Sequence, residues 1–141
     1  MMETQAGTSR NNQFVNRTIL LLDDDSNTLF VLHAILERTA ARVIECESGR
    51  CALQRCEEMA SNIDLLVADV VLQDSNGPAV VREAKPLQPA MKLLYISGYS
   101  MHELQRRGLL ADTEMAPGSV EFLQKPFSPD QFLERVRTLL N

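Results

Sequence analysis

Short, predominantly apolar runs alternate with amphipathic segments along most of the chain. The apolar runs cover residues 19–22, 43–44, 63–68, 93–96 and 120–123. Because the longest run has no alternating polar face, these runs predict strands buried on both sides of a parallel sheet. The segments between and after them carry apolar residues at helical spacing, which are Leu29, Leu32, Ile35 and Leu36; Ala52, Leu53, Cys56 and Ala60; Val80, Val81 and Ala84; and Phe132, Leu133, Val136, Leu139 and Leu140.

The residues at the segment boundaries agree with this alternation. Ser128-Pro129-Asp130-Gln131 combines a capping serine, a proline in the first turn and a glutamine at the third position, as helix starts often do. Gly77-Pro78 opens a helix that ends at Pro86, and Gly108 stops the helix that begins after Ser100. The pattern predicts an α/β fold, a single doubly wound (βα)5 domain with helices on both faces of the sheet.

Composition narrows the class of protein. The chain has 141 residues, of which 45% are hydrophobic and 23% charged, so it can bury a core without metal or disulfides. The net charge of −5 argues against non-specific nucleic-acid binding. No apolar run approaches the roughly 20 residues that cross a bilayer, and residues 1–17 lack the apolar core of a secretory signal. We interpret residues 1–17 as a flexible tail or a cloning remnant, and residues 18–141 as the domain.

Three cysteines, Cys46, Cys51 and Cys56, form neither an even set nor a CxxC pair. This usage favours a reducing, cytoplasmic environment. Cys56 lies on the apolar stripe of its predicted helix and Cys51 lies beside that stripe. We therefore interpret both as small buried or half-buried hydrophobic residues.

Polar side chains follow the predicted strands at the points where these end. Asp23, Asp24 and Asp25 follow the first strand, Asp69 the third, Ser97 the fourth and Lys125-Pro126 the fifth. Carboxyl ends of parallel strands meet at one edge of a sheet, where ligands commonly bind. Neighbouring carboxylates repel one another unless a cation is present, and a set of oxygen ligands favours Mg²⁺. On their own, however, the aspartates would also suit a solvated turn and a helix cap.

A site of this composition suits phosphoryl transfer. The Asp69 carboxylate can act as a nucleophile and form an acyl phosphate. Mg²⁺, the Lys125 ammonium and the Ser97 hydroxyl can then stabilise charge on the phosphoryl oxygens.

Four motifs together make the chain resemble the receiver domain of bacterial two-component response regulators. They are ILLLDDDS, DLLVADVVLQDSNGP, KLLYISGYS and FLQKPFSPDQF, and the resemblance covers residues 18–140. The sequences of the last two motifs resemble those of receivers attached to hybrid sensor kinases. The resemblance implies a flavodoxin-like parallel sheet with strand order 2-1-3-4-5.

The resemblance also implies a role for individual residues. Asp69 would be the phospho-acceptor, assisted by Lys125 and Ser97. The ligands of Mg²⁺ would be Asp24 directly, Asp23 through water, Asp69, and the backbone carbonyl of Val71. Ser97, Tyr99 and Phe122 would form the conformational switch, and the Lys125–Pro126 peptide bond would be cis.

Two positions depart from the usual pattern. Gln73 stands where the family often has proline, so the loop after the acceptor is expected to be less stiff. The apolar Val71 cannot position an attacking water, and we therefore expect slow hydrolysis of the phosphorylated form.

The resulting hypothesis is a phosphorelay module of the bacterial cytoplasm. A histidine kinase or histidine phosphotransfer protein would phosphorylate Asp69, and the surface of the fourth helix, fifth strand and fifth helix would then engage a downstream protein. The domain would not be an enzyme beyond its own phosphorylation and dephosphorylation, and would bind neither nucleic acid nor membrane; homodimerisation stays open.

Two alternatives stay open. One is a pseudo-receiver that binds proteins independently of phosphorylation. The other is an aspartyl-phosphate phosphatase, which the valine at position 71 disfavours because a phosphatase needs a second carboxylate there. The sequence is compatible with a stand-alone regulator and with a piece of a larger protein.

Overall fold

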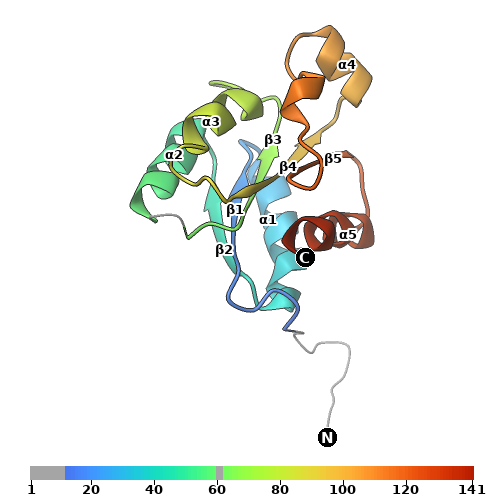
Figure 1. Ribbon diagram of the computed structural model, residues 1–141. Coiled ribbons are helices and arrows are strands. Elements are labelled where there is room, and N and C mark those ends of the chain that lie inside the picture. Colours follow the sequence, from blue (N-terminus) through green and yellow to red (C-terminus); the bar gives the residue numbers. More distant parts are fainter. Residues whose placement is uncertain (1–11, 60–61) are drawn as a thin grey trace, which may run out of the picture.

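A parallel sheet forms the centre of the computed structural model, which describes residues 12–59 and 62–141 (Figure 1). The five strands lie in the order β2-β1-β3-β4-β5, which confirms the predicted topology. Their bounds are β1 Thr18–Leu22, β2 Arg42–Cys46, β3 Leu65–Asp69, β4 Lys92–Ser97 and β5 Val120–Gln124.

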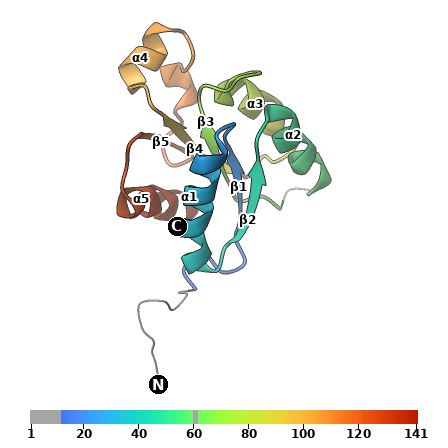
Figure 2. The same ribbon diagram turned by 180° about the vertical axis from the view of Figure 1, so that it is seen from behind.

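Helices cover both faces of the sheet, as Figures 1 and 2 show from opposite sides. Helices α1 (Ser26–Leu36) and α5 (Pro129–Leu140) lie on one face. Helices α2 (Gly49–Glu58), α3 (Gly77–Ala84) and the short α4 (Met101–Arg106) lie on the other. Two single turns, η2 (Glu37–Thr39) and η3 (Asp112–Glu114), complete the regular structure of the described ranges.

The buried strands divide their side chains between two halves of the core. In β1, Ile19 and Leu21 pack with α1 and α5, whereas Leu20 and Leu22 pack with α2 and α3. Successive residues of a strand point to opposite faces, so a strand covered on both sides needs an unbroken apolar run. This arrangement explains why the strands were recognisable in the sequence.

The predicted helix boundaries are confirmed where the chain is described. Ser128 and Gln131 form a reciprocal capping box at the start of α5. Helix α3 opens at Gly77 and ends before Pro86, and Gly108 adopts a positive φ of 73° after α4. The expected contribution of Ala60 to the α2 stripe lies outside the described residues.

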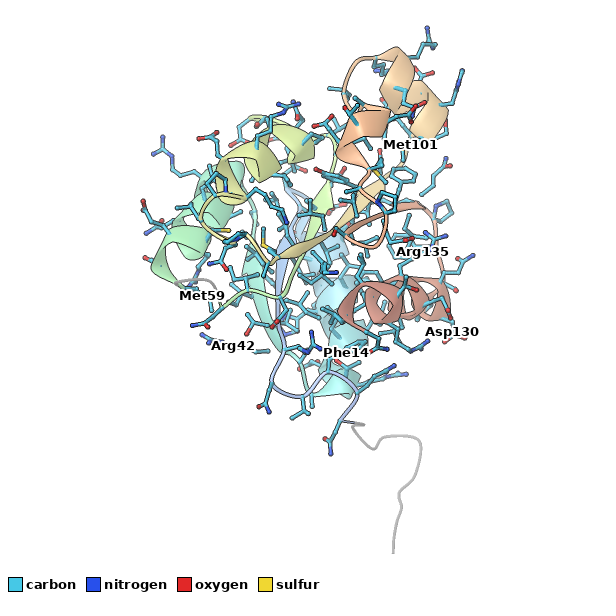
Figure 3. The ribbon with its side chains drawn as sticks, viewed as in Figure 1. Phe14, Arg42, Met59, Met101, Asp130 and Arg135 are labelled. Atoms are coloured by element: carbon cyan, nitrogen blue, oxygen red, sulfur yellow. A yellow bond between two sulfur atoms is a disulfide. The ribbon has the colours of Figure 1, made fainter. Side chains whose placement is uncertain are left out.

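The folded part begins before Thr18. Phe14, which falls in the stretch expected to be a tail and is labelled in Figure 3, is 1% exposed and packs among the side chains of α1 and α5. Its backbone N–H donates to the carbonyl of Thr39 at 2.9 Å. The expectation of a flexible tail is therefore wrong for residues around Phe14; residues 1–11 lie outside the described part.

The interpretation of the cysteines needs a correction. Cys46 at the end of β2 and Cys51 in the first turn of α2 form a disulfide, with a Cα–Cα distance of 5.5 Å. The turn between strand and helix folds the chain back on itself, which the linear spacing of the cysteines did not reveal. Cys56 is a free, buried thiol as expected, and burial raises its pKa.

None of the helices within residues 12–59 and 62–141 has the length and apolar character needed to span a membrane.

Candidate functional site at the carboxyl edge of the sheet

The predicted edge of the sheet brings together residues from three strands. Asp23 follows β1, Asp69 is the last residue of β3, and Lys125 follows β5. The Lys125–Pro126 peptide bond is cis, as expected. The Lys125 backbone N–H donates to the carbonyl of Ser97 at 2.7 Å, which ties the end of β5 to the end of β4.

The Lys125 ammonium joins the two buried carboxylates. Its Nζ lies 2.9 Å from Asp69 Oδ2 and 3.3 Å from Asp23 Oδ2. Burial acts to lower the pKa of Lys125, but the hydrogen bond and charge of Asp69, with the charge of Asp23, outweigh it and raise that pKa. The ammonium is therefore charged at neutral pH and faces Asp69.

Asp23 is the most strongly perturbed carboxyl group of this edge. It is 1% exposed, and its burial raises the pKa from 3.8 to about 6, with the charge of Asp69 adding to the rise. A hydrogen bond from the backbone N–H of Asp25 at 2.9 Å and the charge of Lys125 limit this rise. A buried carboxylate that is only partly compensated is a favourable place for a further cation.

Asp69 is held on both carboxylate oxygens. Oδ2 accepts from Lys125, and Oδ1 accepts from the Val71 backbone N–H at 3.1 Å. Behind it, helix α3 approaches so closely that a Cβ on Gly77 would lie 2.7 Å from the Asp69 carbonyl oxygen. The glycine therefore allows the helix to buttress the strand end, and Asp69, at 8% exposed, has a fixed orientation.

The expected switch residues lie beside this cluster. Ser97 is 1% exposed, and its Oγ accepts from the Tyr99 backbone N–H at 3.0 Å. Tyr99 points outward, and the guanidinium of Arg107 lies 4.5 Å from its ring centre. Phe122 is half-buried in β5, and its carbonyl accepts from Arg135 of α5, which is labelled in Figure 3.

The two remaining predicted metal ligands, Asp24 and Val71, make hydrogen bonds of their own. Asp24 Oδ2 accepts from the Gln73 backbone N–H at 2.7 Å, and Val71 is exposed. Within residues 12–59 and 62–141, no three Asp, Glu, His or Cys side chains form a cluster that could hold a metal ion. Sequence reasoning treated Gln73 only as a departure from proline, but its N–H, which proline lacks, is what holds Asp24.

An exposed apolar surface on α1 was not anticipated. Phe30 is 73% exposed and Val31 53% exposed. Val31 lines a pocket of about 320 Å³ whose opposite wall is Lys125, Pro126 and Phe127. A signal existed in the sequence, because Phe30 and Val31 are large apolar residues outside the stripe that faces the core.

Comparison with known proteins decides the family. The model of the response regulator receiver domain matches residues 19–137. The chain belongs to the receiver domain family.

Similar receivers occur in proteins of different lengths. The chain is 32% identical over 123 residues to the sensor kinase CckA of Brucella abortus, covering 87% of this chain and 12% of that protein. It is 27% identical to the receiver protein CpdR of the same organism, covering 88% of this chain and 97% of CpdR. Against the transcriptional regulator ZraR of Escherichia coli K12 it is 32% identical, over 82% of this chain and 24% of ZraR. The chain thus spans a small part of two of these relatives and nearly all of the third.

Solved receiver structures share the fold. The receiver domain of the hybrid histidine kinase CckA superimposes with a TM-score of 0.72 at 28% identity, covering 88% of this chain and 99% of that one. A CheY-like receiver from Methanospirillum hungatei gives a TM-score of 0.72 at 26% identity, with 88% and 93% coverage. Receiver domains act in two-component signalling as modules rather than as classical enzymes, generally bind Mg²⁺, and interact with histidine kinases or phosphotransfer proteins.

Proposed function

We propose that Asp69 accepts a phosphoryl group from a histidine kinase or histidine phosphotransfer protein in the bacterial cytoplasm. The observation that carries this proposal is the Lys125 ammonium, 2.9 Å from Asp69 Oδ2 and 3.3 Å from Asp23 Oδ2. In the reaction, an Asp69 oxygen forms a bond to phosphorus, the bond between phosphorus and the donor imidazole nitrogen breaks, and the imidazole keeps the electron pair. The charged Lys125 ammonium stabilises negative charge on the phosphoryl oxygens.

The donor set of this edge fits Mg²⁺. Two carboxylates, Asp23 and Asp69, face one ammonium, and burial of Asp23 penalises its charge. Asp24 follows Asp23 directly in the chain. Asp23, Asp24, Asp69 and the backbone carbonyl of Val71 would hold the ion. Its positive charge would offset their mutual repulsion and that of the incoming phosphoryl group. Asp24, whose Oδ2 accepts from the Gln73 N–H, would hold the ion with its other oxygen or after giving up that hydrogen bond.

The proposed switch passes from Ser97 to Tyr99. The Ser97 Oγ accepts from the Tyr99 N–H, so its own proton is available for a phosphoryl oxygen. Movement of Ser97 toward such an oxygen would pull on the backbone of Tyr99. The ring of Tyr99 would then separate from Arg107, and Phe122 would repack beneath it. The changed surface of α4, β5 and α5 would be read by a downstream protein, as a two-state element biased by new phosphoryl contacts.

The phosphodonor protein is proposed to dock on α1. Phe30 and Val31 provide exposed apolar area within reach of the pocket next to Lys125. A second pocket of about 260 Å³ continues from these residues between α1 and α5. Apolar and aromatic anchors of this kind are typical of the centre of a protein interface.

The test is Mg²⁺-dependent phosphorylation by a small phosphodonor such as acetyl phosphate. Wild-type protein is expected to gain one phosphoryl group in the presence of Mg²⁺ and to stay unlabelled when Mg²⁺ is chelated before the donor is added. Asp69→Asn should not be labelled, whereas Asp74→Asn, which removes an exposed carboxylate from the same loop, should be labelled like the wild type.

Equal labelling of the Asp69→Asn and wild-type proteins would refute the site. Absence of Mg²⁺ binding together with absence of labelling would favour the pseudo-receiver. Amide chemical shifts in residues 97–127 that do not change on phosphorylation would refute the switch.

A further inference from the structure

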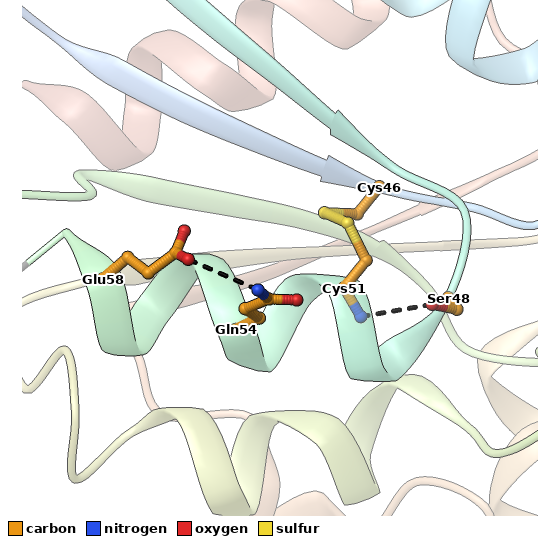
Figure 4. Close-up of a disulfide and its surroundings, with 5 residues drawn as sticks. All are labelled: Cys46, Ser48, Cys51, Gln54 and Glu58. Atoms are coloured by element: carbon orange, nitrogen blue, oxygen red, sulfur yellow. Dashed lines mark hydrogen bonds between the residues drawn. A yellow bond between two sulfur atoms is a disulfide. The ribbon is translucent and has the colours of Figure 1, made fainter.

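A disulfide lies next to Asp23, at the end of the edge strand β2. Lys125 follows β5, which is the opposite edge strand of the sheet. Cys46 ends β2 and is 1% exposed, whereas Cys51 is half-buried in the first turn of α2 (Figure 4). Ser48 caps this helix, with its Oγ accepting from the Cys51 backbone N–H at 3.1 Å. The 5.5 Å between the two Cα atoms falls within the range that a disulfide requires. The covalent link therefore closes the whole turn between strand and helix.

The main chain of Cys46 supports Asp23 directly. The Cys46 carbonyl accepts from the Asp23 backbone N–H at 3.1 Å. Cys46 also pairs in register with Leu22, the residue before Asp23. Asp23 thus depends on Lys125 for its side chain and on Cys46 for its main chain.

A second route joins the disulfide to Asp69 through helix packing. Gly49, two residues before Cys51, lies against Val80 of α3, where a Cβ would come within 2.8 Å of Val80 Cγ2. The same helix α3 begins at Gly77, where an added Cβ would lie 2.7 Å from the Asp69 carbonyl oxygen. Movement of the first turn of α2 would therefore be transmitted to the backbone of the acceptor.

We propose that Cys46 and Cys51 form a reversible thiol–disulfide modification site that tunes the Asp23–Asp69 edge. In a reducing compartment a disulfide is rarely permanent, and those that occur are usually catalytic or redox-sensing. The oxidised pair fixes the β2–α2 turn and holds Asp23 in place; the reduced pair releases the turn and weakens cation binding. The effect on cation binding rests on the proposed function, whereas the modification itself does not.

The proposed reductant is a dithiol, either a small molecule or a thiol–disulfide exchange protein. Its thiolate attacks Cys51 Sγ, since Cys51 is the more exposed of the two residues, and forms a mixed disulfide there. Cys46 Sγ leaves with the electron pair and takes up a proton. The second thiol of the reductant then displaces Cys51 Sγ, closing its own disulfide. The protein gains two electrons and two protons, and the reductant loses them.

The first measurement counts thiols. Native protein kept under mild oxidant, then denatured and alkylated, should expose one cysteine, Cys56, and three after treatment with dithiothreitol. Three free thiols in both samples would overturn the proposal.

The second measurement follows Asp23 in the two redox states. We expect its amide hydrogen to exchange faster after reduction, in the absence of metal. The Mg²⁺ dissociation constant, from a titration followed by amide NMR, should rise about fivefold, the lower end of usual coupling between sites. Unchanged exchange and an unchanged Mg²⁺ constant would overturn the coupling. If Mg²⁺ binds in neither state while the exchange rate still responds, the proposed function fails and the redox proposal stands.

Two variants control the experiment. Cys51→Ser keeps the capped, half-buried position and should behave like reduced wild type whether or not oxidant is present. Cys56→Ala removes the third thiol but leaves the pair, so it should retain the full redox response. A response in Cys51→Ser equal to that of the wild type would assign the effect to another group and refute the site.

Discussion

Replacing Asp23 by asparagine should stabilise the metal-free protein at neutral pH. Asp23 is 1% exposed, and burial raises its pKa from 3.8 to about 6. Each pH unit of this difference corresponds to about 1.4 kcal/mol, so ionising Asp23 in the folded state costs about 3 kcal/mol. Asparagine has the same shape and carries no charge. This cost already includes the attraction of Lys125, so we expect a gain of about 3 kcal/mol.

The pH dependence of this gain identifies its cause. Below pH 3.8 the carboxyl group is protonated in both the folded and unfolded states, so the two proteins should differ little. Between pH 3.8 and about 6 only the unfolded chain loses the proton, and wild-type stability falls relative to the variant. Above pH 6 the difference should be constant.

The assay is urea denaturation in chelator across this pH range, with Asp74→Asn as the exposed control. Adding Mg²⁺ should stabilise the wild type more than Asp23→Asn, because a ligand that binds only the folded state adds to its stability. A variant that is less stable than wild type at pH 7.5, or a difference independent of pH, would refute the reasoning.

Three further substitutions test other parts of the structure. Gly77→Ala should cost about 1–3 kcal/mol in urea denaturation, because the new Cβ would lie 2.7 Å from the Asp69 carbonyl oxygen; unchanged stability would show that α3 can shift. Tyr95→Phe should leave stability unchanged or raise it by up to about 1 kcal/mol. The reason is that Tyr95 is 1% exposed and its hydroxyl has no hydrogen-bond partner in the described ranges. A clear loss of stability on thermal unfolding would contradict this. Phe30→Asn should slow labelling by a phosphorylated donor protein at least about tenfold while labelling by acetyl phosphate stays at the wild-type rate; slowing of both would place Phe30 in folding rather than docking.

The fold could be predicted because its strands and helices have strong local patterns. Strands such as β1, with apolar side chains on both faces, differ clearly from the amphipathic stripe of α5. The acidic edge was predictable for a related reason. In a parallel sheet the residues after each strand converge, so Asp23, Asp69 and Lys125 had to come close once the strand order was right.

The features that were missed depend on turns rather than on periodicity. Phe14 and Val15 interrupt an otherwise polar stretch, and only the folded structure shows that Phe14 belongs to the core. The Cys46–Cys51 bond and the hydrogen bond from Gln73 to Asp24 both join residues across turns. The linear spacing of such residues does not show how a turn orients them, and neither bond leaves a repeating pattern to recognise.

The positions of these turn contacts bear on the energetics of the site. Ionised Asp23 destabilises the fold, yet it must stay at the edge of the sheet if the domain is to hold a cation there. Lys125 offsets the charge of its side chain, while the Cys46 carbonyl holds its main chain and the Asp25 N–H orients one oxygen. Of these three supports, the charge of the Lys125 ammonium is always present at neutral pH. The strand end at Cys46 is the one whose attachment a chemical reaction can change. The β2–α2 turn is therefore the most direct place at which cation binding can be regulated while the phospho-acceptor Asp69 stays intact.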